Sequence, residues 1–138
     1  VETMRPDLWL TLKENVLVTD LQMIRPDLFI VLGYVSWWCF NNNLPCRITS
    51  LIDDVPQRVS KTHASGRAAD VSTRGFGPKD ITNLISFLEE KVGHMGAFSK
   101  SDGKQRVAIY HNVGLGHHIH IQVKRDLDGG FYGKESGH

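Results

Sequence analysis

The chain has 138 residues, of which 41% are hydrophobic and 22% are charged, and this is typical of one globular domain that can bury a core. Its 16 basic and 15 acidic residues leave a formal net charge of +1, so no strong positive field favours nucleic acid or anionic lipid as a partner. The longest apolar run, Leu28–Phe40, is shorter than the about 20 residues of a membrane-spanning helix, so we expect no membrane partner.

The first predicted elements are two helices that begin with the same motif. RPDLWL at Arg5–Leu10 is echoed by RPDLFI at Arg25–Ile30. Proline is tolerated in the first turn of a helix, and the aspartate that follows suits the positive end of the helix dipole. We expect the second helix to run from Pro26 to about Phe40, because an asparagine run and Pro45 follow it.

The rest of the chain predicts strands and one more helix. CRITSLI and AADVS have the composition of buried strands, and the residues from 53 to 65 between them are polar enough for a loop. Pro78 and a helical spacing of apolar residues predict a third helix that ends at Gly93. RVAIYH and HHIHIQV then alternate as an antiparallel pair of strands around the turn NVGLG.

These elements predict an α+β fold, in which a small and mainly antiparallel sheet packs against about three helices. We expect a single domain over residues 1–138, with a core from about 26 to 124 and a flexible tail from about 126 to 138, and a monomer. Cys39 and Cys46 flank a short turn. They could pair, but two cysteines make no disulfide framework, so we expect free buried thiols.

The strand HHIHIQV carries polar side chains on one face. Side chains alternate with period two along a strand, so His118, His120 and Gln122 share a face. His117 falls on the other face, with the aliphatic residues that point into the core. The polar face is either a solvent-exposed surface or a site.

The segment KTHASGRAADV favours a metal site. Zinc binds imidazole nitrogen and carboxylate oxygen, and a catalytic zinc site keeps three protein ligands. His63, Asp70 and one histidine of the strand supply such a set. The small residues between His63 and Asp70 permit a tight turn and close packing of the backbone. The alternative for these two residues alone is an ordinary polar loop.

The residues HASGRAAD match H-x-x-G-x-A-x-D in full. With the later strand histidine, they resemble the LAS-type zinc peptidases: D-alanyl-D-alanine carboxypeptidases, phage L-alanyl-D-glutamate endolysins and penicillin-insensitive murein endopeptidases, which share a fold with the hedgehog signalling domain. The resemblance covers roughly Pro26–Val123. It implies that His63, Asp70 and His120 bind Zn²⁺, and the fragment HIQV favours His120 over its neighbours.

The same resemblance leaves two candidates for the catalytic base. Carboxypeptidase-like members carry a glutamate three positions before the last ligand, where this chain has His117. The murein endopeptidase branch uses H-x-H, which is present here as His118-Ile119-His120. We therefore expect His118 to be the general base or transition-state stabiliser, with His117 as the alternative.

Two departures from the family pattern concern substrate binding. Lys61 stands where the family usually has serine, and Ser50–Asp53 lacks the family's substrate-holding arginine. Three other arginines are candidates to replace it, although an arginine at such a position is more often a solvated surface residue. They are Arg58, Arg67 and Arg74.

The function implied by the resemblance is zinc-dependent hydrolysis of peptidoglycan stem or cross-link peptides, by a phage endolysin-type endopeptidase. Since no signal peptide is visible, we expect it to reach the cell wall (in the periplasm or at the cell exterior) by release from the host cytoplasm or within a virion. A D,D-carboxypeptidase of the same family is one alternative. A catalytically inactive, zinc-containing, hedgehog-like binding module is another.

Four further residues have less specific interpretations. Trp37 and Trp38 could line a sugar-binding groove, but their helical position predicts that at least one belongs to the core. His94 and His111 have no partner at metal-ligand spacing in the sequence, so we expect them to be structural or exposed.

Overall fold

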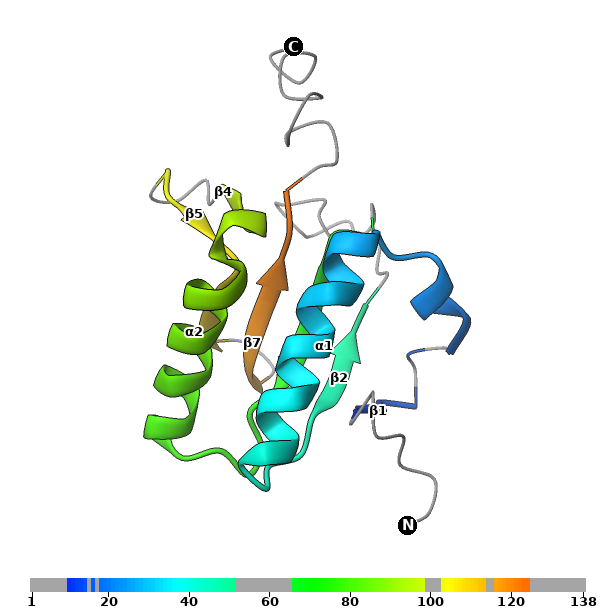
Figure 1. Cartoon of the computed structure of the whole chain (residues 1–138). Coiled ribbons are helices and arrows are strands. Elements are labelled where there is room, and N and C mark those ends of the chain that lie inside the picture. Colours follow the sequence, from blue (N-terminus) through cyan, green and yellow to red (C-terminus); the bar gives the residue numbers. More distant parts are fainter. Residues whose placement is uncertain are drawn as a thin grey trace.

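The computed structural model of the chain describes residues 10–14, 16, 18–51, 66–98, 103–113 and 116–124. In these residues a five-stranded sheet in the order β1-β2-β3-β7-β6 carries two α-helices, and β4 and β5 form a separate two-stranded sheet (Figure 1). The elements, with η for 3₁₀ helices, are β1 (Thr11–Leu12), η1 (Val18–Gln22), α1 (Pro26–Asn41), β2 (Arg47–Ser50), β3 (Ala68–Ser72), α2 (Pro78–Val92), η2 (Gly93–Met95), β4 (Ala97–Phe98), β5 (Gln105–Arg106), β6 (Ala108–Val113) and β7 (Gly116–Gln122).

The strand β7 lies inside the larger sheet, antiparallel to β3 on one side and to β6 on the other. β2 is antiparallel to β3, and among the described strands only β1 is parallel to its neighbour. The α+β class and the mainly antiparallel sheet are therefore confirmed. A strand with hydrogen-bonded neighbours on both sides is a rigid base for side chains, and this matters for the polar face of β7.

The two α-helices begin and end where sequence signals place them. Pro26 occupies the first turn of α1 with Asp27 beside it, and the helix ends at Asn41, one residue beyond the predicted end. The helix α2 begins at Pro78, and the Asp80 carboxylate accepts the backbone N–H of Gly77 at 2.8 Å. This bond satisfies one of the N–H groups that a helix start leaves without an intrahelical partner.

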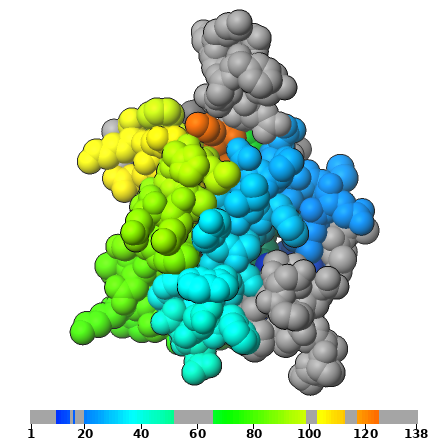
Figure 2. Space-filling view, viewed as in Figure 1, coloured from blue at the N-terminus to red at the C-terminus, as the bar shows by residue number. Residues whose placement is uncertain are grey.

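The core lies between the two helices and one face of the sheet. From the helix side, α1 and α2 cover almost all of β7 (Figure 2). Ile119 and Ile121 of β7 and Val71 of β3 have no exposed surface. They belong to one apolar cluster with residues of both helices, among them Leu28, Leu32, Leu84 and Leu88. Burial of one such side chain stabilises the fold by roughly 1.5–3 kcal/mol.

The structure differs from the sequence prediction in several elements. Of the about three predicted helices, the described residues contain two as α-helices. Most of the first RPDL motif lies outside them, and the chain that follows it forms β1 instead of a helix. The predicted strand RVAIYH is divided at Val107 between β5 and β6. The expected tail from about 126 lies outside the described residues, and no helix within them is long and apolar enough to span a membrane.

Both cysteines are buried free thiols, as predicted. A hydrogen bond with the Cys39 side chain, together with burial, raises the pKa of the Cys46 thiol well above its usual value. A raised pKa disfavours the thiolate, which is the reactive form of cysteine. Both residues also belong to the apolar core cluster, so we assign the pair a packing role.

The two neighbouring tryptophans of α1 have opposite environments. Trp38 is 8% exposed and packs in the core, which confirms that at least one is a core residue, whereas Trp37 is 57% exposed. The Trp37 ring stacks on Phe87 of α2 with ring centroids 5.7 Å apart. An open groove of about 410 Å³ between the helices is lined by Ile30, Gly33, Tyr34, Trp37, Phe87 and Lys91.

Candidate functional site

The polar face of the sheet brings Asp70 of β3 opposite His120 of β7. The register also pairs Ser72 with His118 and Ala68 with Gln122. Because paired residues share a face and alternate residues point to opposite faces, Asp70, His118 and His120 point away from the helices. The predicted sorting of the strand into two faces is confirmed.

Asp70 contacts both histidines of the H-x-H motif. Its Oδ1 lies 3.1 Å from Nδ1 of His120 and 3.7 Å from Nε2 of His118. The side chains of Asp70 and His120 each retain 9% of their surface, whereas the His118 side chain retains 26%. A buried carboxylate is therefore in contact with one buried imidazole and one imidazole that solvent can reach. The Asp70 carbonyl is also bonded by the Thr49 hydroxyl at 3.3 Å.

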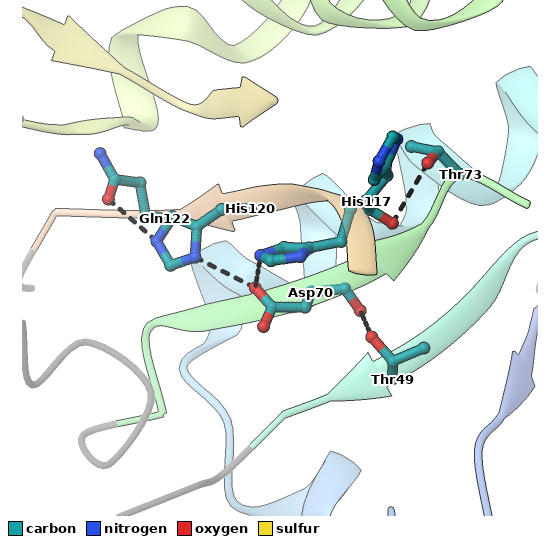
Figure 3. A network of polar contacts seen from close by, with 7 residues as sticks. Thr49, Asp70, Thr73, His117, His120 and Gln122 are labelled. Atoms are coloured by element: carbon teal, nitrogen blue, oxygen red, sulfur yellow. Dashed lines mark hydrogen bonds and ion pairs between the residues drawn. The ribbon is translucent and has the colours of Figure 1, made fainter. Parts of the chain in front are cut away.

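The other nitrogen of His120 is held by Gln122, so that the imidazole lies between a carboxylate and an amide (Figure 3). Nε2 of His120 is 3.1 Å from Oε1 of Gln122. The Gln122 amide nitrogen donates to the carbonyls of Ala97 and Arg106, at 3.2 and 3.1 Å. Carbonyl oxygens only accept hydrogen bonds, so a flipped amide would place oxygen against two oxygens. Gln122 therefore presents an acceptor to His120.

The orientation of the Gln122 amide bears on which nitrogen of the His120 ring carries the proton. Because Oε1 of Gln122 is an acceptor, this contact favours the tautomer of His120 that carries its proton on Nε2. In the neutral ring, Nδ1 then has a lone pair directed at Oδ1 of Asp70, 3.1 Å away. Two electron-pair donors at this distance require a proton or a cation between them. Two zinc ligands with bonds of about 2.0 Å at the tetrahedral angle are about 3.3 Å apart.

A third histidine, His111 of β6, lies beside this pair. It is directly opposite His118 in the register, with ring centroids 5.1 Å apart and planes at 77°. It also stacks on His120 at 5.4 Å with an interplanar angle of 6°. Its spacing in the sequence did not indicate that His111 belongs to the site. The available signal was the hairpin register, because the pairing of Val113 with Gly116 also places His111 opposite His118.

His117, the alternative base, does not join this cluster. As predicted it lies on the other face of β7, but it is exposed instead of buried in the core. Its ring points away from Asp70 and His120 (Figure 3), and Nδ1 is 2.8 Å from the Tyr110 hydroxyl. The backbone carbonyl of His117 accepts a hydrogen bond from Thr73 at 3.1 Å.

The arginine candidates have different environments. Arg67 is half-buried just before β3, and its guanidinium donates to the Val123 carbonyl at 3.2 Å, which ties β3 to the end of β7. Arg74 is exposed in the turn after β3, where its backbone N–H donates to the Ser72 hydroxyl at 3.1 Å. Arg58 lies outside the described residues.

Two of the three predicted zinc ligands, Asp70 and His120, are brought into contact, and the third, His63, lies outside the described residues. The described part of the chain contains no group of three or more His, Cys, Asp or Glu side chains that could hold a metal ion. The donor set nevertheless fits zinc in its chemistry. It consists of a carboxylate oxygen and an imidazole Nδ1 whose other nitrogen donates to an acceptor, as the outer N–H of a metal-binding histidine almost always does.

Comparison with known proteins finds no match for this chain among the family models, the curated proteins or the solved structures.

Proposed function

We propose that the protein is a zinc-dependent peptidase of peptidoglycan that cuts peptide bonds of the stem or cross-link. The observation that best supports this proposal is the contact between Asp70 and Nδ1 of His120, with Nε2 of the same ring held by Gln122. The resemblance of HASGRAAD to the motif of LAS-type zinc peptidases supports it independently. We further propose that the protein acts on the cell wall as a monomer.

The residues that would hold the zinc are His63, Asp70 and His120. When bound, the ion would polarise the scissile carbonyl and lower the pKa of a coordinated water molecule toward about 7. Asp70 would neutralise part of the charge, and its burial keeps solvent away from the carboxylate. Gln122 would keep the His120 ring in its orientation.

His118 would move the proton in this mechanism. An imidazole can both accept and donate a proton, and Nε2 of His118 lies 3.7 Å from Oδ1 of Asp70 on the same face. It would accept a proton from the attacking water and return it to the leaving amine. The His118 side chain is partly exposed, so a substrate can approach it, whereas the His120 side chain is buried. Of the arginine candidates, exposed Arg74 is better placed to meet a substrate than Arg67, whose guanidinium binds a backbone carbonyl.

The decisive experiment is digestion of purified cell walls with the zinc-loaded protein, followed by mass spectrometry of the muropeptides. We expect new stem-peptide fragments, and their loss after treatment with a chelator. Free D-alanine as the sole product would instead identify a D,D-carboxypeptidase. Bound zinc without cleavage at any pH would favour a binding module.

Metal analysis tests the ligand set separately. We expect about one zinc per chain, as in catalytic sites with three protein ligands. The variants His63→Ala, Asp70→Ala and His120→Ala should each lower this content. Full occupancy in all three variants would refute the assignment of the ligands.

A further inference from the structure

Gln122 connects the site to a second part of the fold. Gln122 is 6% exposed, and its side chain has three polar contacts: one with His120 and two with backbone carbonyls of the small sheet. Those carbonyls belong to Ala97 of β4 and Arg106 of β5, which are a directly opposed pair. One cross-strand pair of the small sheet therefore fixes the rotation of the Gln122 amide.

We infer that Gln122 is a positioning residue, which keeps a proton on Nε2 of His120 and so reserves Nδ1 for the cation or proton shared with Asp70. The amide can do this because its two donor hydrogens are already directed at acceptors. Only Oε1 is then left to face the ring. The part of this inference that concerns zinc rests on the proposed function, whereas the position of the proton does not.

The small sheet acts as a brace for this arrangement. Gly96 allows the close approach, because a Cβ at this position would lie 2.5 Å from the carbonyl carbon of Arg106 and 2.6 Å from its oxygen. Gly96 also forms a β-bridge with Val123, next to Gln122. The Gln105 side chain donates to the Gly96 carbonyl at 2.9 Å. The β4–β5 pair is thus held against the end of β7 at the point where the glutamine needs its acceptors.

A merely structural glutamine would fill the same space without influencing His120. The two roles predict different tautomers. If Gln122 positions the ring, His120 of the zinc-free protein carries its proton on Nε2, and zinc binds through Nδ1. If Gln122 only fills space, the carboxylate of Asp70 is the stronger acceptor, and in a neutral ring it would draw the proton to Nδ1.

Long-range ¹H–¹⁵N spectra of the histidine rings in the unmodified protein distinguish these cases, first zinc-free and then with zinc. We expect a protonated Nε2 at His120 in both states and a metal-shifted Nδ1 after zinc is added. A deprotonated Nε2, or zinc coordinated through Nε2, would overturn the inference. Failure to bind zinc would count against the proposed function, while the zinc-free spectrum would still test the role of Gln122.

The variant Gln122→Met supplies a second readout, because it keeps the volume and removes the acceptor. We expect mixed tautomers at His120 and zinc affinity lower by about 10–100-fold, as is usual when an outer-sphere partner of a ligand is lost. Ile121→Val, on the opposite face of the same strand, is the matched control and should change neither. Equal effects in both variants, or none in Gln122→Met, would contradict the inference. If Gln122→Met does not fold, the spectra of the unmodified protein still decide.

Discussion

The two faces of β7 differ in what they require from neighbouring residues. On the helix side, Ile119 and Ile121 are fully buried in an apolar cluster. On the other side, His118 and His120 contact Asp70, and His120 is bonded in turn by Gln122. The apolar face needs side chains of suitable volume, and similar aliphatic residues are usually interchangeable there. The polar face needs particular atoms at particular distances, because each buried polar group must find a partner.

This difference separates the two kinds of damage that a substitution can cause. A change on the helix side should lower the free energy of unfolding and leave metal binding intact in the molecules that remain folded. A change on the polar side should impair metal binding or catalysis first. The following substitutions test this separation.

The largest effect is expected for Asp70→Asn. The amide keeps the shape of the side chain but loses the negative charge that would hold the ion beside His120. We expect zinc content to fall to background and peptidase activity to disappear. This loss is larger than the loss of about 10–100-fold in metal affinity or activity that is usual when a residue outside the ligand set is replaced. Elemental analysis and wall digestion measure the two effects. Wild-type zinc content in this variant would exclude Asp70 as a ligand.

His118→Ala should separate catalysis from metal binding. Its Nε2 is 3.7 Å from Oδ1 of Asp70, and its side chain is more exposed than that of His120. We expect zinc to remain and peptidase activity to fall by about 10²–10⁴-fold, as for the loss of a general acid–base group. Unchanged kcat/KM for a defined muropeptide would rule out this role.

The sequence predicted the regular elements and the contact of Asp70 with the H-x-H strand well. Period-two alternation separated His118 from His117, because it depends only on the local geometry of a strand. It did not predict the depth of burial, which is why His117 was expected in the core and is exposed. The short β1 pairing with β2 had no periodic signal to reveal it.

The parts of the site that were missed depend on contacts between distant segments. His111 joins the cluster through the register of the β6–β7 hairpin, and a one-residue shift of this register would have moved it to the other face. Gln122 obtains its role from carbonyls of Ala97 and Arg106, which any sequence could supply at those positions. Backbone acceptors leave no trace in residue type, so only the fold reveals them.

Ile119→Ala is the test on the helix side. Its side chain has no exposed surface, and the substitution leaves a cavity beneath the helices. We expect the free energy of unfolding to fall by about 2–5 kcal/mol. Urea denaturation measures this loss. Zinc per folded chain should equal that of the wild type below the unfolding transition, and a selective loss of zinc would show that the two faces are coupled.

A smaller effect is expected for His111→Ala. The ring packs against both His118 and His120, so its removal opens one side of the site and loosens both rings. We expect activity to fall by about 10-fold, the lower end of the range for outer residues of metal sites. His94→Ala, in η2 on another part of the chain, is the control and should retain full activity in the same assay. A loss as large as that of His118→Ala would make His111 a direct participant in catalysis.

The smallest effect on activity is expected for His117→Ala, although the neighbouring variant His118→Ala should have one of the largest. His117 is exposed, its ring points away from Asp70, and its Nδ1 bonds the Tyr110 hydroxyl at 2.8 Å (Figure 3). An exposed hydrogen bond of this kind contributes about 0.5–1.5 kcal/mol to stability, and activity should not change. Tyr110→Phe removes the same bond from the other side, so the two single variants and the double variant should lose a similar, non-additive amount of unfolding free energy.

A folded but inactive His117→Ala, beside a nearly normal His118→Ala, would instead place the base three positions before the ligand, as in the carboxypeptidase branch. Their adjacent positions make the pair a strict test, because only the alternation of side chains across β7 separates them.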